Sequence, residues 1–155
     1  MKPLVRQARR ADAPRLRALR LEAGWDAEAV PAWFEAAERG ERAMWVAELA
    51  DEVVAMVALD FVDEDPEVAD GHTTAAVTSL AVAAVVGRQG LGRSLTLFAE
   101  GQAKTRGIRV LTLSTRPTNA AALALYRGLG YQAFKHAPRP WGEAVFLRKA
   151  LEGAT

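Results

Sequence analysis

The chain of 155 residues contains no cysteine, which excludes disulfide bonds, thiolate zinc sites and a cysteine nucleophile. It contains only two histidines, His72 and His136, so we expect no histidine-based metal site and no metal. No hydrophobic run approaches the roughly 18 residues of a membrane span, and the N-terminal residues lack the apolar stretch of a signal peptide. We therefore expect a cytoplasmic protein with no membrane partner.

Neither sign of charge is in excess, because 20 Lys and Arg stand against 19 Asp and Glu. The chain thus lacks the basic surplus of nucleic-acid-binding domains, and we expect no nucleic-acid partner. Half of the residues (50%) are hydrophobic and 25% are charged, which is typical of a globular protein rather than a disordered one. At this length we expect a single domain over residues 1–155.

The charges are sorted along the chain. No Lys or Arg lies between Arg42 and Arg88, where nine Asp and Glu occur from Glu48 to Asp70. From Arg88 to Lys149, eleven Lys and Arg stand against two acids. One interpretation is that one part of the fold attracts cations and the other attracts anions. The alternative is a solvated acidic loop with scattered surface arginines.

The periodicity of apolar residues predicts an α/β fold with a mixed sheet and helices on its faces. The predicted order is strand, two helices, three strands, helix, strand, helix and two strands. Asp12 is expected to cap the first helix, and Asp51-Glu52 to form a tight hairpin turn between the second and third strands. The expected strands cover 4–5, 44–49, 53–62, 74–86, 108–114, 131–134 and 144–147.

A glycine-rich turn joins the run 74–86 to a helix. It contains Gly87, Gly90 and Gly92, flanked by Arg88 and Arg93. Because the first N–H groups of a helix have no intrahelical partner, this turn is a candidate phosphate site. The alternative is a turn that needs glycine only for positive φ. The spacing does not match Gly-x-Gly-x-x-Gly, and a P-loop would have Lys at position 93, so nucleotide hydrolysis is not expected.

Three segments together resemble the GNAT N-acetyltransferase superfamily. SLAVAAVVGRQGLGRSL is similar to its acetyl-CoA loop, and NAAALALYRGLGY to the Asn-x-x-Ala-x-x-x-Tyr-x-x-x-Gly-[Phe/Tyr] segment that follows. RQARRADAPRLRAL resembles the usual opening strand and helix. The resemblance implies a GNAT-like central mixed β-sheet of about six or seven strands with about four helices on its faces, and acetyl-CoA as co-substrate.

The resemblance also assigns residues to the acetyl-CoA site. The backbone of Leu80, Ala81 and Val82 would pair with the pantetheine arm, and Val82 N–H would lie near the thioester carbonyl. Asn119 would contact the pantetheine or form the helix entry; Ala122 belongs to the same site, and Tyr126 would lie near the sulfur. The amides of the turn would hold the pyrophosphate: Gly87, Arg88, Gln89, Gly90, Leu91, Gly92, Arg93 and Ser94. Gly87 departs from the pattern, because the family usually has Arg or Gln there.

The chemistry requires proton transfers. A primary amine of pKa near 10.4 costs about 4.6 kcal/mol to deprotonate at pH 7. The strand before the glycine turn carries no acid where the family often has Glu, so Asp60 is the first candidate base, followed by Asp63 or Glu64. Tyr126 is the candidate acid that returns a proton to the thiolate.

The resemblance therefore implies an enzyme that moves an acetyl group from acetyl-CoA to a primary amine, and because no nucleophile for an acyl-enzyme is evident, we expect direct attack in a ternary complex. The acidic stretch predicts a cationic acceptor, either a small polyamine-like or amino-sugar compound or a peptide amine. The alternative is a non-catalytic acyl-CoA-binding sensor or regulatory module, because the strand carboxylate is missing. The sequence leaves open whether the chain forms a homodimer.

Overall fold

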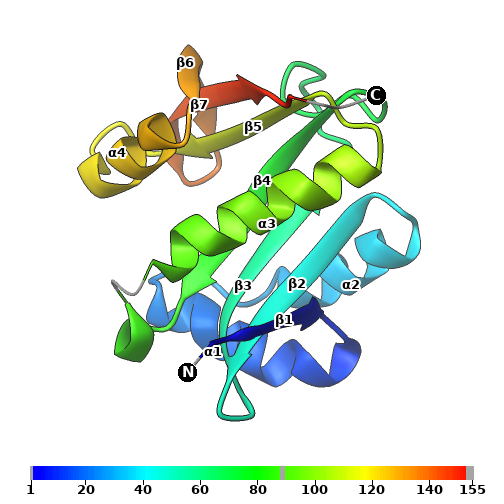
Figure 1. Ribbon diagram of the computed structural model, residues 1–155, viewed down its shortest axis with the longest axis vertical. Helices are drawn as coiled ribbons and strands as arrows, with labels where there is room; N and C mark the ends of the chain where they lie inside the picture. The colour runs from blue at the N-terminus through cyan, green and yellow to red at the C-terminus, as the bar shows by residue number, and fades with distance from the viewer. Residues whose placement is uncertain (1, 88–89, 153–155) are drawn as a thin grey trace.

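A computed structural model of the chain describes residues 2–87 and 90–152, and its centre is a mixed sheet of seven strands (Figure 1). The spatial order is β1-β2-β3-β4-β5-β7-β6, and all neighbours are antiparallel except β4 and β5. The strands are β1 (Leu4–Gln7), β2 (Arg42–Leu49), β3 (Glu52–Asp60), β4 (Thr74–Val82), β5 (Val110–Thr115), β6 (Gln132–Arg139) and β7 (Gly142–Ala150). The helices are α1 (Ala13–Glu22), α2 (Val30–Glu38), α3 (Leu91–Thr105) and α4 (Ala120–Gly128), with 3₁₀ turns at Arg10–Asp12 and Ala84–Val86.

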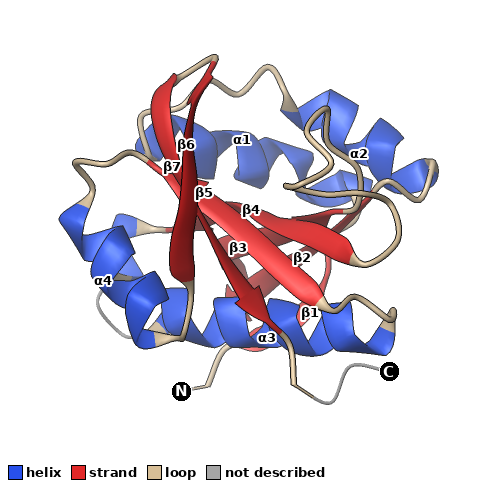
Figure 2. Ribbon diagram, turned by 90° about the horizontal axis from the view of Figure 1, so that it is seen from above, coloured by secondary structure: helices blue, strands red, loops and turns tan. Residues whose placement is uncertain are grey.

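Two helices cover each face of the sheet (Figure 2). The helices α1 and α2 lie on one side, and α3 and α4 lie on the other. The helix α3 buries Leu91, Leu95, Ala99 and Ala103, whose i, i+4 spacing places them in one stripe. Full burial of a leucine such as Leu95 contributes about 1.5–3 kcal/mol. None of the described helices, of which α3 is the longest at 15 residues, has the length and apolar character needed to span a bilayer.

The predicted α/β class and the order of the elements are confirmed. The last two strands are longer than the predicted 131–134 and 144–147. For β6 the reason is that it is an edge strand whose side chains do not alternate cleanly between core and solvent. The predicted strand 74–86 ends at Val82, and its last residues form the 3₁₀ turn Ala84–Val86. Apolar composition alone does not distinguish these two states.

The β2–β3 hairpin turns one residue earlier than predicted. Ala50 and Asp51 have φ values of 51° and 64°, and Glu52 is the first residue of β3. Positive φ at both central residues is the requirement of the type I′ turns that join twisted strands. The expected pair Asp51-Glu52 is therefore wrong by one position, and an alanine occupies a backbone conformation that favours Gly or Asn.

Asp12 precedes α1, but its carboxylate does not cap that helix. Its oxygens accept hydrogen bonds from Arg6 at 2.8 and 2.9 Å and from the backbone N–H of Arg9 at 2.9 Å. The hydrogen bond from Arg6 is the main cause that holds the pKa of Asp12 below its ordinary value. Asp12 therefore ties the beginning of α1 to β1.

Candidate active site

The strands β4 and β5 separate in the middle of the sheet. In the described part of the chain they pair only from Thr74 to Ala76, opposite Val110 to Thr112. The remainder of β4 keeps its antiparallel pairing with β3 on the other side. A V-shaped gap, here called the fork, therefore opens along 77–82 and presents backbone N–H and C=O groups that can bind an extended ligand as a strand would.

The beginning of α3 lies at this fork. Gly90 precedes α3 with φ of 76°, a conformation that favours glycine, and has no side chain to occupy the free amides of the first turn. A Cβ placed on Gly92 would lie 3.9 Å from the side chains of both Leu80 and Leu125. The structure thus brings together the glycine turn, β4 and α4, the three segments that the family resemblance assigns to one site.

The other predicted residues of the glycine turn vary in exposure. Arg93 and Ser94 are exposed on the first turn of α3, whereas Leu91 is buried. Gly87 has φ of −58°, so its backbone does not require glycine. Arg88 and Gln89 lie outside the described residues. Along β4, Ala81 is buried, while Leu80 and Val82 are half-buried.

Tyr126 lies on α4, at the side of the fork that carries α3. Asn119 caps this helix, since its side chain accepts a hydrogen bond from the amide of Ala122 at 3.1 Å. Tyr126 packs against the main core, and burial raises the pKa of its phenol. The hydroxyl is therefore protonated at neutral pH and available as a donor.

A buried polar cluster holds the ring of Tyr131, which packs against Tyr126. The rings of Tyr126 and Tyr131 meet edge to face at 6.3 Å between centroids. The Tyr131 hydroxyl donates to Glu100 of α3 at 3.0 Å, and Lys149 of β7 donates to the other oxygen of Glu100 at 2.9 Å. Burial is the main cause that raises the pKa of Tyr131. This cluster joins the end of α4 to both α3 and β7.

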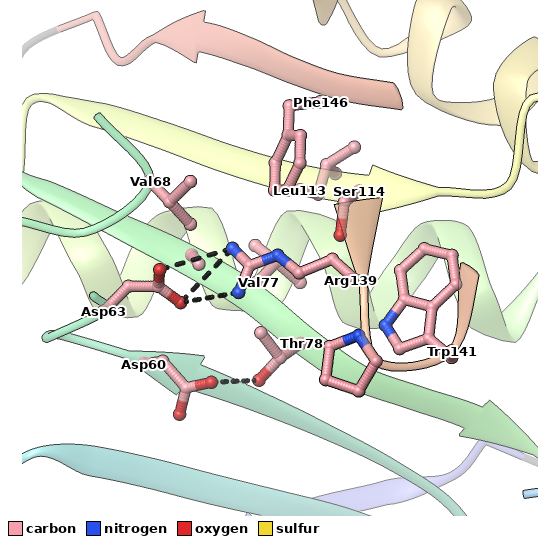
Figure 3. Close-up of a pocket in the computed structure, with 12 residues that line it drawn as sticks. Asp60, Asp63, Val68, Val77, Thr78, Leu113, Ser114, Arg139, Trp141 and Phe146 are labelled. Carbon is pink, nitrogen blue, oxygen red and sulfur yellow. Dashed lines mark hydrogen bonds and ion pairs between the residues drawn. The ribbon is translucent and has the colours of Figure 1, made fainter. Parts of the chain in front are cut away.

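A pocket of about 200 Å³ opens at the fork (Figure 3). The tip of the β6–β7 hairpin lies on the side of the sheet that carries α1 and α2, opposite α3 (Figure 2). The pocket lining contains Asp60 but not Tyr126, so the two predicted catalytic residues do not share it. The lining residues are Asp60, Asp63, Val68, Ala76, Val77, Thr78, Leu113, Ser114, Arg139, Pro140, Trp141 and Phe146.

Both carboxylate oxygens of Asp60 are already hydrogen-bonded. Arg42 of β2 donates to Oδ1 at 2.7 Å, and the Thr78 hydroxyl donates to Oδ2 at 2.9 Å. The side chain of Arg42 is 6% exposed, and burial is the main cause that lowers its pKa. Sequence reasoning assigned no role to Arg42, although the alternation of Arg42, Met44 and Val46 on β2 places all three on one buried face.

Part of the acidic stretch forms ion pairs with β6. Asp63 accepts hydrogen bonds from Arg139, at 3.2 Å for the shortest, and Lys135 contacts both Asp65 and Glu67. Both cations belong to β6. These two β6 cations therefore cancel part of the negative charge of the stretch, while the segregation of charge along the rest of the sequence stays an interpretation.

Comparisons with known proteins match a family profile and the overall fold. The acetyltransferase (GNAT) family profile matches residues 5–131. The [ribosomal protein bS18]-alanine N-acetyltransferase of Escherichia coli (strain K12) is 48% identical over 44 residues, covering 28% of this chain and only 30% of that relative. A ribosomal-protein-alanine N-acetyltransferase structure from Brucella melitensis has a TM-score of 0.80 at 24% identity, covering 96% of this chain and 99% of that chain. A Salmonella typhimurium protein solved with its cofactor acetyl-CoA has a TM-score of 0.81 at 20% identity, covering 100% of this chain and 97% of that chain.

Proposed function

We propose that this chain, which belongs to the acetyltransferase (GNAT) family, transfers an acetyl group from acetyl-CoA to a primary amine. The family match over residues 5–131 confirms the resemblance seen in the sequence. The observation that carries the proposal is the fork, where β4 loses its partner strand beside the free amides of α3. A strand-like pantetheine arm and a diphosphate need these two kinds of backbone donor at adjacent positions.

Residues of the fork would bind the donor from the α3 side. Bound acetyl-CoA supplies a thioester whose carbonyl carbon accepts a nucleophile. The backbone of Leu80, Ala81 and Val82 would pair with the pantetheine arm, and the first amides of α3 would hold the pyrophosphate. Arg93, exposed on the same turn, would add a charge-assisted contact.

The acceptor would approach from the opposite side, through the pocket. Its amine nitrogen attacks the thioester carbon directly, the C–S bond breaks, and the thiolate leaves. We assign Tyr126 the donation of a proton to that thiolate. Asp60 would take the proton of the acceptor through a water, because a carboxylate that already accepts two hydrogen bonds retains further lone pairs.

The acceptor in this proposal is a cationic primary amine. Asp60 and Asp63 line the pocket beside Arg139, and although each already pairs with an arginine, their carboxylates retain lone pairs that can accept hydrogen bonds from an arriving ammonium group. An α-amino group of pKa near 7.7–8.0 costs about 1 kcal/mol to deprotonate at pH 7, against about 4.6 kcal/mol for a lysine-like amine. The chemistry therefore favours a peptide α-amine, which agrees with the alanine in the name of the E. coli relative.

A second candidate is a non-catalytic acyl-CoA sensor, and the occupied oxygens of Asp60 favour it. Release of free thiol from acetyl-CoA over a panel of peptide, polyamine and amino-sugar acceptors separates the two candidates. We expect the fastest release with peptide α-amines. Binding of acetyl-CoA with no amine raising thiol release above background would establish the sensor and refute the enzyme.

A further inference from the structure

We propose that Arg42 is a positioning residue that holds β4 in the bulged shape on which the fork depends. This inference rests on the proposed function only in taking the fork as the acetyl-CoA site. Arg42 lies on β2, two strands away from the part of β4 that it holds.

The strand β4 is irregular at the fork. The register with β3 passes from Ala58↔Thr78 to Met56↔Ala81, so two residues of β4 oppose the single residue Val57. Such a bulge bends a strand and increases its twist. Ser79, one of these two β4 residues, has φ of 55°, a conformation that costs a non-glycine residue about 1–2 kcal/mol. The surrounding structure must therefore hold the bulge in place.

Arg42 supplies that restraint through three hydrogen bonds. Its Nη2 donates to the Ser79 hydroxyl at 2.7 Å, and its Nη1 donates to the Thr78 hydroxyl at 3.2 Å. Nη1 also donates to Asp60 at the end of β3. One guanidinium thus fixes the bulge residue Ser79, and Thr78 directly before the bulge, to the end of β3.

The burial of Arg42 makes this restraint rigid. Its guanidinium carbon lies 4.6 Å from the centroid of the Trp33 ring on α2, which covers it. Its Nε is buried and, among the described residues, has no hydrogen-bond acceptor. A buried arginine with an unsatisfied donor is expensive to maintain. This cost is explained if Nη1 and Nη2 hold the β4 bulge in the conformation that the fork requires.

Lysine cannot replace Arg42, because a single ammonium on a flexible side chain lacks the planar guanidinium that reaches Asp60, Thr78 and Ser79 together. Arg42→Lys keeps the charge opposite Asp60 and removes the link to the bulge. Ser79→Ala is milder, since it removes one acceptor and leaves Arg42 in place. Arg6→Lys is the matched control, because Arg6 is also an arginine paired with carboxylates, but it lies at the edge strand β1 and is less buried than Arg42.

The test measures two quantities in the full chain. The first is the dissociation constant of coenzyme A, and the second is the hydrogen-exchange rate of the backbone amides of 80–82. We expect Arg42→Lys to weaken coenzyme A binding by about tenfold and to accelerate exchange at 80–82 by a similar factor. We expect Ser79→Ala to change both by about threefold. Arg6→Lys should leave both within about twofold of the unsubstituted chain.

Equal effects of Arg42→Lys and Arg6→Lys at 80–82 would show general loosening of the sheet and overturn the proposal. If Arg42→Lys does not fold, Ser79→Ala decides, and unchanged exchange at 80–82 in that variant overturns the proposal as well. If the unsubstituted chain binds no coenzyme A, the proposed function fails. The exchange comparison still decides the role of Arg42 in that case.

Discussion

At the scale of single residues, the phenol of Tyr126 is the group whose chemistry is most directly testable. Because burial raises its pKa, the hydroxyl keeps its proton through neutral pH. We expect Tyr126→Phe to lower kcat by about 10²–10⁴-fold and to leave the KM for acetyl-CoA nearly unchanged, as measured by steady-state thiol release.

Tyr131→Phe is the control for that substitution. It removes the hydrogen bond to Glu100 and therefore lowers stability, but it leaves the Tyr126 hydroxyl in place. We expect its kcat to stay within about threefold of the unsubstituted chain. A kcat for Tyr126→Phe that equals that of the unsubstituted chain at every pH would remove the acid role from Tyr126.

The pair of half-buried Arg6 and buried Asp12 predicts a pH-dependent contribution to stability. The pKa of Asp12 is lowered in the folded chain, so its stabilisation is present above the unfolded pKa near 3.9 and is lost as the pH falls through the folded pKa. We expect Asp12→Asn to lower the free energy of unfolding by about 1–3 kcal/mol at pH 7, because charge-assisted hydrogen bonds are lost, and the difference to shrink below about pH 4. Urea unfolding at several pH values measures it.

Glu38→Gln provides the contrast, because Glu38 and Arg10 form an exposed ion pair with side chains 64% and 61% accessible. Its cost should stay below about 1 kcal/mol. An equal cost for both substitutions would contradict the importance of burial for Asp12.

The sequence predicts some site residues and not others for a physical reason. Asn119 and Gly90 act locally, at helix beginnings, so short patterns reveal them. Arg42 acts on Ser79, 37 positions away in sequence, and its partners are known only when three strands are placed side by side. For the same reason, the sequence does not reveal that both carboxylate oxygens of Asp60 accept hydrogen bonds from residues on neighbouring strands.

At the scale of elements, the β2–β3 turn predicts a stabilising substitution. Ala50 has φ of 51°, so Ala50→Gly removes strain in the folded state. After the added entropy of the unfolded chain is subtracted, we expect the free energy of unfolding to rise by about 0.5–1.5 kcal/mol in urea titrations. Ala18→Gly, in the exposed part of α1, should instead lower it by about 1 kcal/mol. A loss of stability for both would show that the turn is not strained.

The elements differ in how far the sequence determines them. The stripe of α3 and the apolar runs of β2 and β3 follow from periodicity, because each buries one face or both faces completely. The separation of β4 from β5 does not follow, because nothing in either strand alone states where their pairing ends. The family resemblance, rather than the periodicity, placed a ligand between them.

At the scale of the whole molecule, the fork predicts that binding couples to global stability. Coenzyme A at 100 times its dissociation constant should raise the free energy of unfolding by about 2.7 kcal/mol. For a domain of this size that corresponds to a Tm increase of roughly 5–11 °C in differential scanning fluorimetry. Pantetheine at the same concentration, without the diphosphate, should give a smaller shift. Equal shifts for the two ligands would contradict phosphate binding at the beginning of α3.

The ion pairs between the loop 63–70 and β6 make one wall of the pocket sensitive to ionic strength. Arg139 with Asp63, and Lys135 with Asp65 and Glu67, hold the hairpin wall of the pocket against that loop. These pairs are partly open to solvent, and dissolved salt shortens the reach of such charges from about 10 Å at 0.1 M to about 3 Å at 1 M. Rising ionic strength therefore weakens the ion pairs at one wall of the pocket, whereas the buried hydrogen bonds of Arg42 are little affected. We thus expect high salt to loosen the acceptor side of the fork first.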